Sequence, residues 1–441
     1  MSEELIRLAE QAGIVGAGGA GFPTHAKLNA KADTVIINGA ECEPLLRVDQ
    51  QLMQKYAKEL LDALDMIVEH VGAASGVVGV KAHYTEAVRE LEKAVSSHPK
   101  LRIHQLGSFY PAGDEQVLVC EVTGRVVPEG GIPLNVGVVV CNVETALNLH
   151  TAVTKNQPVV EKYVTITGAV KTPKSVLVPI GASVREVLKL AGGPTIDQYK
   201  IINGGPMMGK VVSPDTFITK TTKGLIVLPE DHMLLKSLEK PMEASIRDAR
   251  IACMQCSLCT EVCPRANLNH QIHPHKLMRV AAYGSLCDEK ETPMNAYLCC
   301  GCRLCEYACV MGLQPWKLNG NFKTILGKNG IRNTLNMKPD APSPFRELKR
   351  YPVAKLIRQL SLTDFDVPAP MNWKLRTFST VTIELKQNVG MPAEPVVKLG
   401  DKVAKNDLIA KIPEGKLGAN LHASISGTVT EVTASTMTIK A

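Results

Sequence analysis

The stretch CMQCSLCTEVC, from Cys253 to Cys263, recurs as CCGCRLCEYAC from Cys299 to Cys309. Both stretches follow the pattern C-x2-C-x2-C-x3-C, the spacing by which thiolates hold [4Fe–4S] clusters in proteins. Such close spacing lets one tight loop present three thiolates to one face of a cluster, while the fourth cysteine binds the other cluster. The repeat therefore predicts short helical pieces that hold two [4Fe–4S] clusters.

The same rule assigns the eight thiolates to two ligand sets. One cluster takes Cys253, Cys256, Cys259 and Cys309, and the other takes Cys299, Cys302, Cys305 and Cys263. Structural zinc is the alternative, but its usual signature is two C-x2-4-C pairs separated by a dozen or more residues. Iron–sulfur is favoured. Pro264 follows the first stretch, and Val310 takes the corresponding position after the second. Cys287 and Cys300 lie outside the pattern and are expected to be packing residues.

Length and composition limit the possible classes of protein. A chain of 441 residues suggests roughly three domains. Ten of its 13 cysteines fall between Cys253 and Cys309, which favours a metal protein of a reducing compartment over a disulfide scaffold. The net charge of +7 comes without a concentrated basic run, and aromatic residues are only 4%, so nucleic-acid binding is not expected. Because no secretory signal or membrane-length apolar stretch is present, we expect a cytoplasmic protein without a membrane span.

The pattern of apolar residues divides the chain further. Strand and helix patterns alternate over residues 1–155, which predicts an α/β layer domain. The expected helices there are Glu3–Gln11, Val48–Val71 and Glu86–Val95, and the expected strands are Thr34–Ile37, Gly76–Lys81 and Val136–Cys141. A small β-rich module with one helix follows over 160–228. Residues 328–372, rich in proline and charge, suggest connecting structure, and 380–440 suggest a compact all-β end.

A glycine-rich segment near the start has the residues of a ligand-binding loop. Gly16-Ala-Gly18-Gly19-Ala-Gly21 contains a G-x-G-x-x-G, but a helix precedes it and Phe22-Pro23 follows it. This context differs from an ordinary dinucleotide-binding turn, and a flexible turn is the alternative. The density of glycines bares backbone N–H groups, and Lys27 could offset the charge of a phosphate.

Four motifs in order resemble the FMN- and NADH-binding subunit of respiratory complex I. They are GAGGAGFPTHAKL at 16–28, NGAECEP at 38–44, YPAGDE at 110–115 and NVET at 142–145. The whole chain is still more similar to the C subunit of the Rnf electron-transport complex and to the PduS-type cobalamin reductases of propanediol-utilisation microcompartments. The Rnf subunit carries its barrel-sandwich module at the front. Here that module, around Leu399 to Gly427, lies at the end, an order that resembles the cobalamin-reductase branch.

The resemblance implies an α/β multidomain fold with four modules and a linker. It implies a Rossmann-like FMN/NADH-binding domain at 1–158, an SLBB β-grasp domain at 159–235, a helical bacterial ferredoxin-type 2[4Fe–4S] domain at 240–325, a linker at 326–375 and an all-β barrel-sandwich hybrid at 376–441.

It also implies roles for individual residues. Gly16, Gly18, Gly19 and Lys27 would surround the phosphate and isoalloxazine, and Asn142 and Thr145 would hold the phosphate end. Asn38, Glu41 and Glu43 would line the flavin ring and its ribityl side. Phe22, Gly113, Asp114 and Glu115 would face the nicotinamide nucleotide. No residue is expected to act as a nucleophile, because the chain would relay electrons.

The function implied is an NADH-dependent cob(III)alamin or cob(II)alamin reductase that passes electrons through FMN and two [4Fe–4S] clusters. It would reactivate a B12-dependent diol dehydratase system inside a bacterial microcompartment, with a corrinoid adenosyltransferase and shell proteins as partners. An Rnf-like module that serves ferredoxin or a flavoprotein is one alternative, and a corrinoid-binding scaffold with structural clusters is another. The D-x-H-x-x-G signature of stored corrinoids is absent, so a corrinoid would be a visiting substrate. Lys416 lies at an offset from Gly427 that resembles a lipoyl hairpin, although its neighbours are unlike the usual ones. The motifs leave open the acceptor and the choice between NADH and NADPH.

Overall fold

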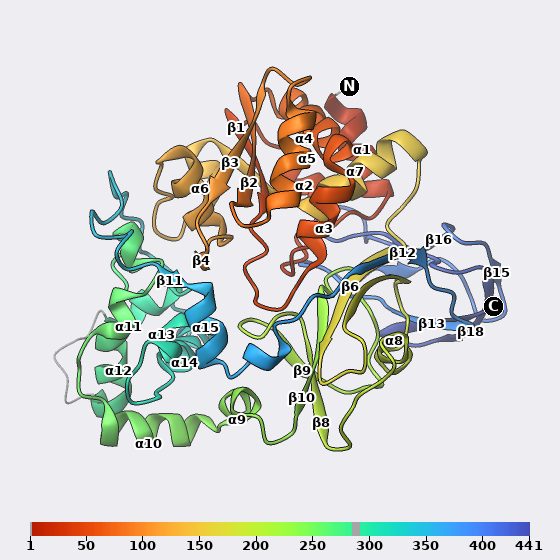
Figure 1. The fold of residues 1–441 in the computed structure, drawn as a ribbon. Coiled ribbons are helices and arrows are strands. Elements are labelled where there is room, and N and C mark those ends of the chain that lie inside the picture. Colours follow the sequence, from red (N-terminus) through yellow and green to blue (C-terminus); the bar gives the residue numbers. More distant parts are fainter. Residues whose placement is uncertain (1, 285–291) are drawn as a thin grey trace.

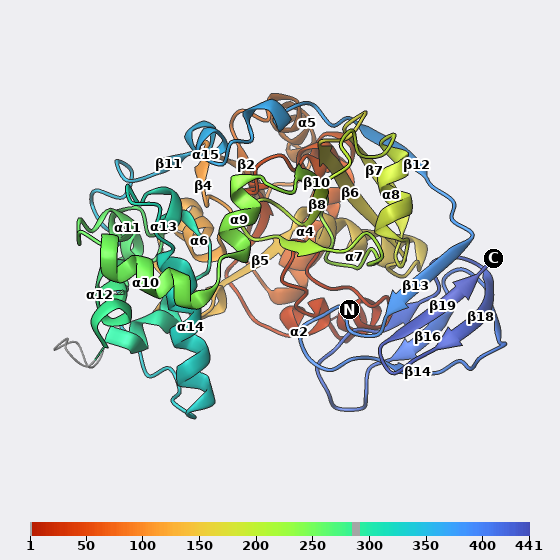
Figure 2. The ribbon, with the colours of Figure 1, turned by 90° about the horizontal axis from the view of Figure 1, so that it is seen from below.

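The computed structural model describes residues 2–284 and 292–441. Cys287, expected to be a packing residue, lies outside the described residues. Four structured parts are visible in two views at right angles: the cysteine-bearing helices lie at one end, the last β strands lie at the other, and the remaining two parts lie between them (Figures 1 and 2). None of the described helices is both long enough and apolar enough to cross a membrane.

The N-terminal domain is built on a parallel sheet of four strands in the order β3-β2-β1-β5. Its elements are α1 (Ser2–Gln11), α2 (Thr24–Leu28), β1 (Thr34–Gly39), α3 (Val48–Lys55), α4 (Ala57–Val71), β2 (Ser75–Lys81), α5 (Thr85–Val95), β3 (Leu101–Leu106), β4 (Phe109–Tyr110), α6 (Glu115–Thr123), η1 (Pro133–Val136), β5 (Val138–Asn142) and α7 (Val143–Lys155). Val35 and Ile37 pack in the core on one face of β1, and Ile36 packs on the other. This burial on both faces is typical of a parallel sheet covered by helices.

The expected helix Val48–Val71 is two helices, α3 and α4. They meet at Tyr56, whose backbone φ of −121° is outside the helical range. The apolar spacing continues through the break, so the sequence pattern alone did not reveal it.

The middle domain is a mixed sheet in the order β12-β7-β6-β10-β8-β9. It comprises β6 (Glu161–Gly168), β7 (Lys174–Pro179), α8 (Val184–Leu190), β8 (Tyr199–Asn203), β9 (Lys210–Val212), β10 (Gly224–Pro229) and, from much later in the chain, β12 (Met371–Leu375). Helix α8 packs on the sheet through Val184, Val187 and Leu188. The expected β-rich module with one helix has this arrangement.

The cysteine domain consists of short helices joined by tight turns. They are α9 (Met233–Glu239), α10 (Met242–Ala252), α11 (Leu258–Glu261), η2 (Ala266–Leu268), α12 (Pro274–Tyr283), η4 (Thr292–Leu298), α13 (Leu304–Tyr307) and α14 (Pro315–Lys328). Two small apolar cores hold them, one around Ala249, Met278 and Leu318 and the other around Leu277 and Ala296.

The segment expected to be a linker, 326–375, contains regular structure. It includes β11 (Tyr351–Pro352), α15 (Val353–Gln359) and η5 (Thr363–Phe365), and it ends in β12. Strand β11 pairs with β4 of the N-terminal domain, and β12 pairs with β7 of the middle domain. The apolar residues that anchor α15, among them Leu356 and Leu360, are buried. The proline and charge that suggested a connector lie around these anchors.

The C-terminal domain is all β. It has one sheet in the order β13-β19-β18-β15 and a second in the order β14-β16-β17. The strands are β13 (Thr380–Glu384), β14 (Glu394–Pro395), β15 (Lys402–Val403), β16 (Leu408–Lys411), β17 (Leu421–His422), β18 (Gly427–Val432) and β19 (Thr436–Lys440). One core that includes Val381, Ile409 and Met437 lies between the sheets.

Candidate functional site

The glycine loop, residues 16–22, is closed at its base and open at its tip. Gly16 donates its N–H to the carbonyl of Phe22 (2.9 Å), and Gly21 donates to the carbonyl of Gly16 (3.1 Å). Gly18 and Gly19 at the tip are exposed, and an added Cβ on Gly19 would meet no atom within 4 Å. Gly19 also has a φ of +117°, which side-chain-bearing residues rarely adopt. The loop therefore presents backbone N–H groups at an uncrowded edge, as an anion site requires.

Helix α7 and the ends of β1 and β5 lie beneath this loop. Asn38 and Asn142 are register partners where the two parallel strands end. The side chain of Asn142 caps α7 by accepting the N–H of Glu144 (3.0 Å), and Thr145 Oγ1 accepts the N–H of Ala17 in the glycine loop (2.9 Å). The N-terminus of α7, which favours an anion, is thus tied to the loop.

Asn38 also joins the third motif to the sheet. Its Nδ2 donates to the carbonyl of Gly113 (2.8 Å), and a Cβ on Gly113 would lie only 2.7 Å from Cys42 Sγ. Lys27 Nζ donates to the carbonyl of Val140 (2.8 Å). The four motifs, far apart in sequence, meet at the carboxyl edge of one sheet.

The two glutamates of the NGAECEP motif point in different directions. Glu41 accepts the N–H groups of Asp49 (2.8 Å) and Gln50 (3.2 Å), so it caps α3. Glu43 accepts the N–H of Met207 from the middle domain (2.8 Å), and its Oε1 is buried without a partner. Burial raises the pKa of Glu43 to about 7. Of the two, Glu43 is the one that holds an unused polar atom.

The residues expected to face the nicotinamide nucleotide also separate. Phe22 is 36% exposed at the end of the glycine loop, and Glu115 lies 3.5 Å from Lys27 Nζ. Asp114 caps α6 and makes a two-point ion pair with Arg265, which follows Cys263 in the cysteine domain. Burial alone would raise the pKa of Asp114, but the Arg265 guanidinium holds it below its usual value. Asp114 therefore joins two domains.

A buried ionic network connects the glycine loop to the middle domain. Lys162 on β6 donates to Glu144 Oε2 (2.5 Å) and to the carbonyl of Ala17 (3.4 Å). Lys223 lies between Glu144 (2.9 Å) and Asp49 (2.6 Å). Neither lysine is among the site residues predicted from the sequence. A usable signal was present, since Lys162 and Lys223 interrupt or border apolar strands.

The first predicted set of thiols, which we call the outer set, converges in the structure. Its members are Cys253, Cys256, Cys259 and Cys309. Burial raises the pKa of Cys259 to about 12, and the nearby thiols of the other three members add to the effect. Cys256 is exposed, and Cys253 and Cys309 are partly exposed. The outer set is thus at the surface.

The second set, which we call the inner set, is more deeply buried. Its members are Cys263, Cys299, Cys302 and Cys305. Cys263, Cys302 and Cys305 are each 8% exposed, and Cys299 is partly exposed. Burial raises the pKa of Cys305, and the thiols of Cys299 and Cys263 raise it further. Cys300, expected to pack, contacts a buried core and lies beside Cys302.

The inner set lies against the flavin motifs. Tyr110 Oη donates to the carbonyl of Cys302 (2.9 Å). Burial raises the pKa of Tyr110, and the charges of Glu43, Cys302 and Cys42 raise it further, so all three groups are its neighbours. Arg303 reaches the carbonyl of Met207 (2.8 Å) beside the Glu43 contact. One buried contact region therefore joins the NGAECEP and YPAGDE motifs to the inner set.

The residues present fit the implied cofactors. Each set offers four sulfur donors and no oxygen donor, which suits an iron–sulfur cluster. No three His, Cys, Asp or Glu side chains among residues 2–284 and 292–441 stand close enough to share one metal ion. Thiolates around a single tetrahedral ion lie only about 3.8 Å apart, closer than around a cubane. The uncrowded loop tip and the N-terminus of α7 suit the phosphate of a flavin. The unpartnered Glu43 Oε1 suits its ring.

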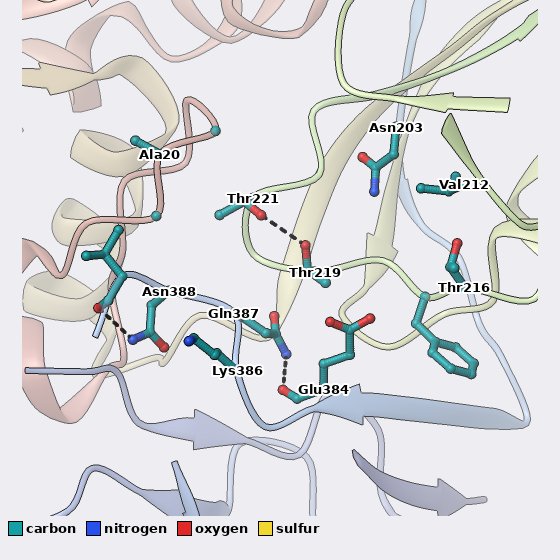
Figure 3. Close-up of a pocket in the computed structure, with 14 residues that line it drawn as sticks. Ala20, Asn203, Val212, Thr216, Thr219, Thr221, Glu384, Lys386, Gln387 and Asn388 are labelled. Atoms are coloured by element: carbon teal, nitrogen blue, oxygen red, sulfur yellow. Dashed lines mark hydrogen bonds between the residues drawn. The ribbon is translucent and has the colours of Figure 1, made fainter. Parts of the chain in front are cut away.

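An open polar pocket of about 360 Å³ borders the glycine loop at Gly19 to Gly21 (Figure 3). Its walls come from Gly19–Gly21, from Asn203 and the threonines of the middle domain, and from Glu384 to Val389 of the C-terminal domain. Of the residues predicted to bind flavin or nucleotide, only Gly19 lines it. Its lining includes no cysteine.

Comparison with known protein families assigns each part. Residues 9–151 match the Nuo51 FMN-binding domain, 163–211 the SLBB domain, 252–314 a 4Fe-4S dicluster domain, and 373–441 the RnfC barrel sandwich hybrid domain. The cobalamin reductase PduS of Citrobacter freundii is 41% identical over 437 residues, which cover 97% of this chain and 94% of that protein. The chain belongs to the PduS family.

Other relatives agree with this assignment. The PduS cobalamin reductase of Salmonella typhimurium is 39% identical over 99% of this chain and 96% of that protein. The C subunit of the Na(+)-translocating ferredoxin:NAD(+) oxidoreductase complex of Acetobacterium woodii is 35% identical over 60% of this chain and 58% of that protein. Membership of the PduS family and the domain matches confirm the predicted fold class and the cofactors, FMN and [4Fe–4S] clusters.

Proposed function

We propose that this chain transfers electrons from NADH, through FMN and two [4Fe–4S] clusters, to the cobalt of a corrinoid. The PduS relatives that match nearly its whole length are cobalamin reductases. The observation that carries the proposal is the bond from Tyr110 Oη to the Cys302 carbonyl, because it joins the flavin motifs to the inner set. Electrons leaving a flavin at this edge would find the inner set first.

When bound, FMN accepts the two electrons of a hydride together and releases them one at a time, as the clusters require. The chain's residues bind and orient it. The glycine-loop N–H groups and the N-terminus of α7 would receive the phosphate, and Thr145 fixes the loop by accepting from Ala17. Asn38 and Gly113 form the floor of the site, where the close approach of Cys42 leaves no space for a side chain at position 113.

Glu43 offers a place for a proton near the redox path. Its Oε1 is buried and unpartnered, and burial raises its pKa to about 7. Near neutral pH, Glu43 can therefore take up a proton at Oε1 when negative charge arrives nearby, and release it when the charge leaves. Arg303 is the cation that faces this carboxyl and limits the shift.

The test is an anaerobic assay of the reconstituted chain, with flavin and iron quantified beside it. We expect NADH-dependent reduction of cob(III)alamin that requires both flavin and iron, with NADPH compared in parallel. Flavin- and iron-loaded protein that oxidises NADH with ferricyanide but leaves cob(III)alamin unchanged would refute the corrinoid as acceptor.

A second candidate function is electron exchange with ferredoxin. The relative from Acetobacterium woodii, which is part of a ferredoxin:NAD(+) oxidoreductase complex, and the match to the RnfC barrel sandwich hybrid domain favour it. Reduction of ferredoxin but not of corrinoid in the same assay would decide for this candidate. The first proposal includes a place inside a bacterial microcompartment, with a corrinoid adenosyltransferase and shell proteins as partners. Co-purification with the shell tests that location.

A further inference from the structure

Five large apolar side chains are exposed around the outer set. They are Ile251, Met254, Leu258, Val310 and Met311, and we call them the outer patch. Each lies within two residues of an outer-set cysteine in the sequence. Ile251 is 77% exposed, Met254 62% and Val310 64%. A cluster of exposed apolar residues of this kind marks an interaction site more often than isolated exposed residues do.

The position of the outer patch makes it the exit for electrons. The inner set is covered by the N-terminal and middle domains through Tyr110 and Arg303. The outer set lies next to the inner set, since α11, which carries Cys259, contacts α13, which carries Cys305. Its Cys256 is exposed, whereas Cys302 at the corresponding position is buried. Of the eight ligand cysteines only Cys256 is fully exposed, so the outer set offers the more open route by which an electron can leave.

The size of the outer patch indicates what it binds. A stable protein–protein interface takes about 20–30 residues from each partner. Five side chains around one exposed cysteine form a much smaller footprint, suited to a single flat macrocycle. The polar pocket of Figure 3 is a poorer candidate for the site where an electron acceptor binds. No cysteine lines it, and the C-terminal domain forms one of its walls.

We propose that the outer patch is the corrinoid docking site, where methyl groups at the edge of the corrin ring rest on these side chains beside Cys256. This inference rests on the proposed function. NADH gives up a hydride and becomes NAD⁺, and its two electrons leave singly. Each electron reduces one cobalt(III) to cobalt(II), so one NADH reduces two corrinoids and one proton is released. No bond to the protein forms or breaks in this step.

The first test compares two substitutions of equally exposed apolar residues in the holoprotein. Val310→Lys places a charge in the outer patch, and Leu399→Lys, at a residue 68% exposed, places one in the C-terminal domain. We expect kcat/KM for cob(III)alamin to fall by about tenfold or more in the first variant only. NADH:ferricyanide activity, flavin content and iron content should match the unsubstituted chain in both.

The second test measures binding without turnover. A methionine-selective oxaziridine label is applied to the holoprotein with and without cob(II)alamin. We expect the corrinoid to protect Met254 and Met311 from labelling but not Met208 or Met391, which are 58% and 48% exposed.

The outcomes separate this inference from the proposed function. If the unsubstituted chain fails to reduce cob(III)alamin, the proposed function is wrong. If it succeeds and Val310→Lys reduces the corrinoid at the same rate, or Met254 and Met311 stay unprotected, the outer patch is not the docking site. Protection of both methionines by a protein partner, without protection by corrinoid, also overturns it.

Discussion

The two cysteine stretches have the same spacing and the same loop conformation. Gln255 and Ser257 in the first have φ values of 56° and 60°, and Gly301 and Arg303 at the corresponding positions have 69° and 65°. Each stretch then forms one short helix, α11 or α13. The local sequence therefore sets the loop conformation in the same way twice.

Their surroundings differ. Cys302 and Arg303 are covered by Tyr110 and Met207 from other domains, whereas Cys256 is exposed and Ser257 is partly exposed. Because the loops are alike, the difference in role comes from residues far away in the sequence. The motif thus specifies the ligands, and the neighbouring domains determine which set lies near the flavin motifs.

Removing one ligand from each set gives the largest expected effect. We expect Cys302→Ala to lose about half the iron and all NADH-dependent corrinoid reduction, because the inner set would be the entry point. Cys256→Ala should lose a similar amount of iron and also fail with corrinoid. Transfer from the flavin to the remaining cluster, followed by stopped-flow absorbance and electron paramagnetic resonance, should survive only in Cys256→Ala. Equal loss of that transfer in both variants would contradict the inner and outer order.

Breaking the ion pair between Arg265 and Asp114 tests how strongly the cysteine domain is attached to the N-terminal domain. Their side chains are only 10% and 14% exposed, so Arg265→Ala leaves a buried carboxylate without its cation. We expect a loss of about 3–5 kcal/mol of stability, measured from the midpoint of anaerobic unfolding. Arg185→Ala removes an exposed pair with Asp215 and should cost less than about 1 kcal/mol. Similar losses would mean that the inner pair is solvated.

Glu43 gives the contact region beside the inner set a pH dependence. Burial raises its pKa from 4.5 to about 7 in the folded chain. Between these values the folded state holds a proton that the unfolded state has released, so stability falls as pH rises from about 4.5 to about 7. We expect Glu43→Gln to remove this fall, which amounts to about 3 kcal/mol, seen by comparing unfolding midpoints at both ends of the range. An unchanged slope would show that Glu43 is ionised throughout.

Exchanging the left-handed residues for glycine should give the smallest effect. Ser257→Gly relieves a φ of 60° at a partly exposed position and should stabilise the outer loop by about 1 kcal/mol or less. Arg303→Gly relieves a similar φ but loses the bond to Met207 and the stacking on Trp316, so it should destabilise. Holoprotein unfolding followed by cluster absorbance measures both. Stabilisation by both would mean that the Arg303 contacts contribute little.

The sequence predicted those features that local spacing determines. The fold class and the cofactors are confirmed, and the thiols assigned to each set converge. The individual flavin and nucleotide residues remain predictions. Lys162 and Lys223 were missed because a lysine in a strand usually points to solvent, and only the neighbouring carboxylates of Glu144 and Asp49 make their burial favourable.

The segment 326–375 was underestimated for a related reason. Its strands β11 and β12 are too short to show a period, and each pairs with a strand more than 190 residues earlier, as the register partners Tyr351 and Tyr110 or Met371 and Ser175 show. A partner at that distance leaves no trace in a local window.

The pairing of β11 with β4 has a consequence for biogenesis. Both cysteine stretches are synthesised before Tyr351 emerges from the ribosome. The pairing of β11 with β4 therefore forms only after both stretches exist. Until then Tyr351 cannot cover the buried core that it shares with Tyr110 and Cys302. We therefore expect the inner cluster to be loaded more easily before this strand is in place than after it.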